Sequence, residues 1–172
     1  MARPPSDAEF SEFVHASWPS LYRTAYLLLG DRGLAEDLVQ TALAKTYASW
    51  GRVRDLGAAR AYARTTLVNT ASSWFRKKGW RKEQPSEVVQ EHAYEDDPSV
   101  RPALMQALAQ LPPRQRAVVV LRFYDDLSVA DAAHALGCTE GTVKSQTSDA
   151  LAALRQLLGE SVVPLESGAN HD

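Results

Sequence analysis

The chain has 172 residues, of which 45% are hydrophobic and 23% are charged, and its formal net charge is −2. This composition is ordinary for a soluble globular protein, and no apolar run reaches the ~18 residues that a membrane span requires. The N-terminus lacks the apolar stretch of a secretory signal, and a single cysteine, Cys138, allows neither an internal disulfide nor a cysteine-built metal site. We therefore expect a cytoplasmic protein of one or two small domains, without membrane insertion.

The first part of the chain is predicted to form three helices. Apolar residues recur at three- and four-residue spacing up to Leu29, between a capping box at Ser6 and Glu9 and a stop at Gly30. Asp31 opens a second helix, whose apolar stripe ends at Trp50, and a short loop covers 51–56. A third helix is expected at about 57–78, with Tyr62, Leu67, Val68, Ala71, Trp74 and Phe75 turned toward the core.

Charge is strongly segregated in the middle of the chain. Residues 60–82 contain seven basic residues and no acid, whereas residues 83–97 contain six acids and no Lys or Arg. Residues 83–101 also include Pro85 and Pro98 and lack any periodic apolar pattern. We therefore interpret residues 83–101 as a solvated linker between two domains.

The part after the linker is also predicted to be helical. A short helix ends at Pro112-Pro113, and a second runs from Arg114 to Tyr124. The stretch LSVADAAHALG then begins with a capping box at Ser128 and Asp131, and a tight turn at 137–138 leads to a last helix that Thr139 caps. A short helix, a glycine turn and a second helix describe a helix-turn-helix.

The last helix begins with many hydrogen-bonding side chains. In a helix-turn-helix the second helix enters the DNA major groove by its N-terminal turns, which must show donors and acceptors. Val143 would hold the front of this helix on the domain, with Leu151, Leu154 and Leu158 holding the rear. The side chains left to face outward are Glu140, Thr142, Lys144, Ser145, Gln146 and Ser148. A merely solvated helix end is the alternative, and Asp149 would be repelled by phosphates unless it meets a cytosine amino group.

Three stretches together resemble an extracytoplasmic-function RNA polymerase sigma factor of the sigma-70 family, nearest to the sigma-E-like actinobacterial subgroup. They are AEDLVQTALAKTY, RAYARTTLVNTASSWFRKKG and LPPRQRAVVVLRFYDDLSVADAAHALGCTEGTVKSQTSDAL. The resemblance covers roughly residues 8–160. It implies an all-α fold: sigma domain 2 at 1–82, the acidic linker at 83–101, sigma domain 4 with the helix-turn-helix at 102–160, and a flexible tail at 161–172.

The resemblance also implies the partners. The first domain would dock on the β′ clamp of core RNA polymerase and recognise the −10 element of promoter DNA, while the second would bind the β flap and recognise the −35 element. Residues that match the clamp-docking helix are Glu36, Asp37, Leu38, Val39 and Gln40. Simple capping is the alternative role for the two carboxylates, because acids stabilise a helix N-terminus. Control by a separate anti-sigma factor is left open.

The resemblance assigns promoter opening to the first domain. Asn69 matches the position that reads an exposed −10 base, and the loop Gly51–Leu56 matches a pocket for a flipped base. The accompanying cations are Arg52, Arg54, Arg60, Arg64, Arg76, Lys77 and Lys78. The acidic linker would thread through the polymerase channel that RNA later occupies, with a simple solvated spacer as the alternative.

For the −35 element, the resemblance assigns a reading surface in the last helix and two phosphate contacts before it. The set comprises Arg122 and Ser128 for phosphates, and Thr142, Lys144, Ser145, Gln146, Ser148 and Asp149 on the helix. The arginines that the family often has near Gln146 and Asp149 are absent here.

Other chemistry is not indicated. The four histidines are scattered without metal-ligand spacing, and neither a phosphate-cradling glycine loop nor a hydrolase elbow occurs. We expect no catalytic residue, no metal and no cofactor, and hence no enzyme. Two other classes stay as alternatives: a response regulator, whose helix-turn-helix is similar but which needs an α/β receiver, and a regulator that binds only protein, which the basic block disfavours.

Overall fold

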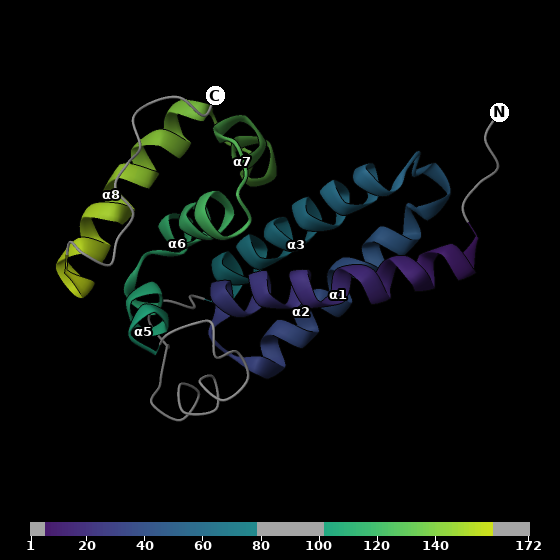
Figure 1. Cartoon of the computed structure of the whole chain (residues 1–172), viewed down its shortest axis with the longest axis horizontal. Helices are drawn as coiled ribbons and strands as arrows, with labels where there is room; N and C mark the ends of the chain where they lie inside the picture. The colour runs from purple at the N-terminus through teal and green to yellow at the C-terminus, as the bar shows by residue number, and fades with distance from the viewer. Residues whose placement is uncertain (1–5, 79–101, 160–172) are drawn as a thin grey trace.

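The structure is a computed structural model that describes residues 6–78 and 102–159. All regular elements in these two ranges are helical, as expected for the all-α class (Figure 1). The expected linker and C-terminal tail lie outside the described residues. The elements are α1 (Asp7–Leu29), α2 (Arg32–Ala48), the short 3-10 helix η1 (Trp50–Arg52), α3 (Leu56–Lys78), α5 (Pro102–Gln110), α6 (Pro113–Val119), the π-helical η2 (Val120–Tyr124), α7 (Val129–Leu136) and α8 (Glu140–Leu158).

Helices α1, α2 and α3 pack on one another and form the first half of the molecule. The Ser6 Oγ accepts from the backbone N–H of Glu9 at 3.2 Å, and the Glu9 carboxylate accepts from the N–H of Ser6 at 2.8 Å. Gly30 ends α1 in the left-handed conformation, at φ 71°, which glycine adopts without a Cβ clash. The predicted capping box and the predicted stop are therefore confirmed.

Two details of the first half differ from the prediction. Helix α2 ends at Ala48, so Trp50 belongs to η1, although it is buried as expected. Tyr62 was predicted to face the core, but 41% of its surface is exposed. Its hydroxyl lies 3.0 Å from the Ser49 Oγ, a polar partner at the surface that periodicity along α3 does not reveal.

The second half contains the predicted helix-turn-helix, α7 and α8. The Ser128 Oγ accepts from the N–H of Asp131 at 3.0 Å and begins α7, while Gly137 ends α7 at φ 66°. The Thr139 Oγ1 accepts from the N–H of Thr142 at 3.1 Å and begins α8. The helix expected at 114–124 begins one residue earlier and continues from α6 into η2 without a break.

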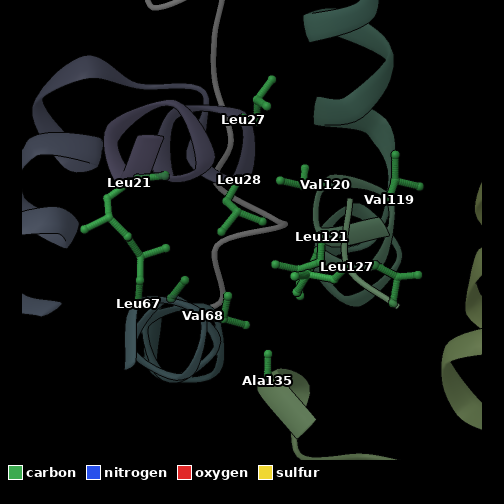
Figure 2. Close-up of a cluster of buried hydrophobic side chains, with 14 of the residues drawn as sticks. Leu21, Leu27, Leu28, Leu67, Val68, Val119, Val120, Leu121, Leu127 and Ala135 are labelled. Atoms are coloured by element: carbon green, nitrogen blue, oxygen red, sulfur yellow. The ribbon is translucent and has the colours of Figure 1, made fainter. Parts of the chain in front are cut away.

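The two halves pack directly against each other, an arrangement that the sequence did not predict. Figure 2 shows Leu28 of α1 and Val68 of α3 facing Val120 and Leu121 of η2 and Ala135 of α7. All five side chains are at most 2% exposed. One continuous hydrophobic cluster therefore joins the halves. Among the described helices, none combines the length and the hydropathy that crossing a membrane would demand.

Candidate polymerase and nucleic-acid interfaces

The expected polymerase-docking segment lies in α2 and divides into an outer and an inner face. Glu36, Asp37 and Gln40 are exposed, whereas Leu38 and Val39 are completely buried and pack α2 against the rest of the first half. The expectation is therefore corrected for the two apolar residues, because burial leaves their side chains no surface to offer. A docking contact would use the three polar residues.

The capping alternative for the two carboxylates is not supported. The N-cap of α2 is Asp31, whose Oδ1 accepts from the N–H of Leu34 at 3.0 Å. The first turn of α2 contains no acidic residue, and Glu36 and Asp37 lie in the turn that follows. Since the dipole effect falls off within the first turn, stabilising the helix end does not explain these exposed acids.

The loop before α3 is anchored to the core by its apolar side chains, and its two arginines face solvent. Trp50 is 4% exposed, and its indole N–H donates to the Ser6 carbonyl at 3.0 Å. Val53 is half-buried against the core, while Arg52 and Arg54 are exposed. This alternation fixes the loop backbone and leaves both guanidinium groups available to a polyanion.

Helix α3 carries a polar stripe on its solvent side. Tyr62, Asn69 and Arg76 are all exposed and follow one another at intervals of seven residues. Because an α-helix has 3.6 residues per turn, residues seven apart lie on nearly the same face, about 10.5 Å apart along the axis. The side-chain amide of Asn69 forms no hydrogen bond to another described residue, so both its N–H donors and its carbonyl acceptor are open to a ligand.

The predicted DNA-binding cations of α3 differ in how far they are exposed to solvent. Arg60, Arg76 and Lys77 are exposed, Arg64 is half-buried, and the Lys78 side chain lies outside the described atoms. Sequence analysis missed Lys45, an exposed residue of α2 whose Nζ donates to the Thr70 Oγ1 at 3.0 Å, one residue from Asn69. Lys45 adds a cation beside Asn69 only because α2 packs on α3, and this packing cannot be read from the local sequence.

The first turns of α8 have the composition and exposure of a recognition helix. Lys144, Ser145, Ser148 and Asp149 are exposed, and Thr142 and Gln146 are half-buried. Behind them, Val143 is completely buried. The rear of the helix is held by Ala150, Leu151 and Leu154, each at most 3% exposed. The Ser145 hydroxyl already donates to the Thr142 carbonyl at 3.1 Å, so it offers DNA an acceptor more readily than a donor.

The two expected phosphate contacts before α8 have structural tasks as well. Ser128 is the N-cap of α7. Arg122 is half-buried, its Nη1 donates to the Leu127 carbonyl, and its Nε is buried without a hydrogen-bond partner. A phosphate contact by Arg122 would therefore use its other terminal nitrogen, Nη2.

A buried arginine, which sequence analysis did not single out, links the two halves. Arg116 is 5% exposed, and its guanidinium donates to the carbonyls of Leu28 at 2.7 Å, Ala109 at 3.0 Å and Leu111 at 3.1 Å. Burial lowers the pKa of Arg116 to about 10, so the group stays charged at neutral pH. The sequence does indicate that the helix of Arg116 is buried, because the neighbouring run Val118–Leu121 is apolar on every side. Such a pattern is expected for a helix that other elements cover all round.

A second polar contact crosses the same interface. The Thr24 hydroxyl donates to the Asp125 Oδ1 at 2.9 Å. Burial raises the pKa of the Asp125 carboxyl, while the Thr24 hydrogen bond and the charge of Arg64 oppose that shift. Arg64 of the expected −10 surface is thus electrostatically coupled to a carboxylate of the other half.

Within residues 6–78 and 102–159, no three histidine, cysteine or carboxylate side chains lie together so that they could hold a metal ion. Two of the four histidines, His92 and His171, lie outside those ranges.

Comparisons with known proteins agree with this division into two halves. Residues 13–81 match the family described as Sigma-70 region 2, and residues 101–154 match the family described as Sigma-70, region 4. The chain is 41% identical over 153 residues to the RNA polymerase sigma-E factor of Streptomyces coelicolor, covering 87% of this chain and 86% of that protein. The chain belongs to the sigma-70 family. It is an alternative sigma factor, which directs RNA polymerase to promoters.

Further relatives place the sigma factor in the extracytoplasmic-function group. It is 34% identical over 147 residues to the ECF RNA polymerase sigma factor SigL of Mycobacterium tuberculosis, covering 81% of this chain and 83% of the relative. A solved structure, the sigma factor RpoE of Bartonella quintana in complex with the anti-sigma factor NepR, is similar with a TM-score of 0.66 at 27% identity, covering 87% of this chain and 96% of that one.

Proposed function

We propose that the sigma factor reads the two promoter elements with two separate surfaces. The α3 stripe around Asn69 and the loop cations Arg52 and Arg54 would bind the opened −10 element. The first turns of α8 would read the −35 element, with Lys144 and Gln146 as principal contacts. The observation that carries the proposal is the exposure of Asn69, with a free amide, on a helix surrounded by cations. Aromatic and cationic side chains on one groove suit single-stranded DNA, where stacking of one base contributes about 1–3 kcal/mol.

Core RNA polymerase is the partner that both halves would share. Glu36, Asp37 and Gln40 of α2 would contact the β′ clamp, and the second half would contact the β flap. The domain limits follow the sequence expectation: 1–82 for domain 2, 83–101 for the linker, 102–160 for domain 4 and 161–172 for the tail. The sigma factor would act in the cytoplasm and by binding alone, without a cofactor or a reaction of its own.

A separate anti-sigma factor is a further proposed partner. The support is the similarity to the Bartonella quintana sigma factor, which was solved together with its anti-sigma factor NepR. Copurification of a tagged chain from an actinobacterial host would test for such a partner.

The experiment for the main proposal separates polymerase docking from DNA reading. The sigma factor is reconstituted with core polymerase of Streptomyces coelicolor and given a promoter library randomised at the −35 and −10 positions. Glu36→Ala with Asp37→Ala is expected to weaken holoenzyme assembly at every promoter, with the exposed Glu12→Ala in α1 as matched control. Asn69→Ala is expected to leave assembly intact and to abolish opening, measured by permanganate reactivity of −10 thymines. If Asn69→Ala opened promoters like the parent, the −10 assignment would be wrong.

A further inference from the structure

The first turn of α1 lies against the end of α2, directly before the loop that leads into α3 (Figure 1). The Trp50 indole N–H donates to the Ser6 carbonyl at 3.0 Å, and the Tyr47 hydroxyl donates to the Asp7 Oδ1 at 2.8 Å. The Phe10 ring contacts both aromatic side chains, with its centroid 4.9 Å from that of Tyr47 and 5.0 Å from that of Trp50. We call Ser6, Asp7 and Phe10 the α1 anchor. Neither the proposed polymerase docking nor the proposed reading of the two promoter elements uses it.

Helix α3 holds the same loop from its other end. The Asp55 Oδ1 accepts from the N–H of Ala58 at 2.7 Å, and the Tyr62 hydroxyl lies 3.0 Å from the Ser49 Oγ. Tyr62 belongs to the exposed stripe of α3 that contains Asn69. The loop is therefore suspended between the α1 anchor and this stripe. Where its two exposed arginines lie relative to Asn69 depends on both supports.

A gain in stability explains the contacts of the α1 anchor poorly. The Ser6 carbonyl already accepts from the N–H of Phe10 at 3.0 Å, so it stays paired without the indole. Tyr47 is 47% exposed and Asp7 is also exposed, so water can replace either partner of their hydrogen bond. Such a bond contributes little to the free energy of unfolding, because folding only exchanges it for bonds to water. It still restricts where the two side chains lie.

We propose that the α1 anchor positions the loop before α3 for promoter opening, by holding Arg52 and Arg54 at a fixed place relative to Asn69 before DNA arrives. Its three members are positioning residues, because they act on the loop only through Tyr47 and Trp50. Groups that are already held lose less conformational freedom on binding, so a fixed loop accepts an extruded base more readily than a free one. This inference rests on the proposed −10 function of the loop and of Asn69.

The first test measures the loop itself, in holoenzyme without DNA. A nitroxide on Gly51→Cys reports its mobility, since a Cβ at Gly51 would meet no neighbouring atom of the described residues within 4 Å, and Cys138→Ser removes the native thiol. We expect Tyr47→Phe to shorten the rotational correlation time of the label at least twofold, and Asp7→Ala to do the same. Asp7→Asn keeps an acceptor oxygen for the Tyr47 hydroxyl, so this matched control should leave the label unchanged.

The second test measures promoter opening with the same variants, by permanganate reactivity of −10 thymines. Tyr47→Phe and Asp7→Ala should open the promoter at least threefold more slowly, and Asp7→Asn at the parental rate. Trp50→Phe added to Tyr47→Phe should slow opening at least tenfold. Its matched control is Trp18→Phe added to Tyr47→Phe, because Trp18 is half-buried about 12 Å further along α1 than Phe10. Holoenzyme assembly and −35 selection should stay within twofold of the parent, whereas a general loss of folded protein would lower both.

Two results would overturn the proposal: equal label mobility in the parent and in Tyr47→Phe, or a more mobile loop that opens promoters at the parental rate while Asn69→Ala abolishes opening. If Asn69→Ala itself opened promoters like the parent, the proposed −10 function would fail instead. In that case the label still decides whether the α1 anchor positions the loop: a shorter correlation time in Tyr47→Phe supports it, and an unchanged one refutes it.

Discussion

Arg116→Met tests most sharply how the two halves depend on each other. The substitution keeps a long side chain but removes three hydrogen bonds, to the carbonyls of Leu28, Ala109 and Leu111. Each carbonyl left buried without a donor costs about 1–3 kcal/mol, and the relief of a buried charge offsets part of the sum. With three carbonyls affected, we therefore expect the free energy of unfolding to fall by about 2–5 kcal/mol.

The assay for Arg116→Met is urea unfolding followed by two probes. All four tryptophans lie between residues 18 and 80, so their fluorescence reports the first half, while far-ultraviolet circular dichroism reports the helices of both. The parent should show coincident transitions, and Arg116→Met should separate them, because the Leu28 contact is one of those that couple the halves. Arg114→Met, two residues away and exposed, should change stability by no more than about 0.5 kcal/mol. If both variants lie within about 1 kcal/mol of each other, Arg116 does not hold the fold as described.

Three further predictions concern the surfaces and the charge at the interface. Gln146→Ala should weaken DNA binding by about 1–3 kcal/mol on the preferred −35 sequence and only slightly on a site altered at the base that Gln146 reads. The control Gln156→Ala, at the rear of α8, should not weaken binding to either site. A uniform loss of binding across −35 variants would contradict base reading. Lys144→Ala should weaken holoenzyme binding about equally on all −35 sequences and lower the salt slope by about one; sequence-dependent loss would instead indicate a base contact. The raised pKa of the folded Asp125 carboxyl means that this group stabilises the parent fully below pH 3.8, the ordinary pKa of an aspartate, and that this stabilisation is lost as pH rises through the folded pKa. Asp125→Asn does not titrate, so its stability relative to the parent should increase as pH rises above 3.8. A stability difference between the two proteins that stays constant with pH would refute this.

Features set by neighbours in the chain could be predicted from the sequence. The ends of α1, α2, α7 and α8 depend on side chains that bond backbone groups three residues away, such as Ser6 and Thr139, or on a glycine with positive φ. Short-range hydrogen bonds of this kind are readable as spacing. The exposed front of α8 was predicted for the same reason, since only Val143 interrupts its polar residues.

Features set by packing between distant segments could not be predicted. Tyr62 lies on α3, which is covered on more than one side, so its period alone does not distinguish an inner from an outer position. Lys45 comes to Thr70 from another helix, 25 residues away. The interface between the halves depends on the Thr24–Asp125 contact, which spans 101 residues. The charge pattern predicted a linker and two domains, and it contained no information on whether those domains touch.

The central claim is that α3 and α8 read two separate promoter elements, and one measurement tests it most directly. Holoenzyme reconstituted with the parent, with Asn69→Ala or with Gln146→Ala transcribes a library randomised at both elements, and the selected sequences are compared. We predict that Asn69→Ala loses selection only at the −10 positions and Gln146→Ala only at the −35 positions. Loss of selection at both elements by either variant, or unchanged selection by both, would contradict this division of the molecule.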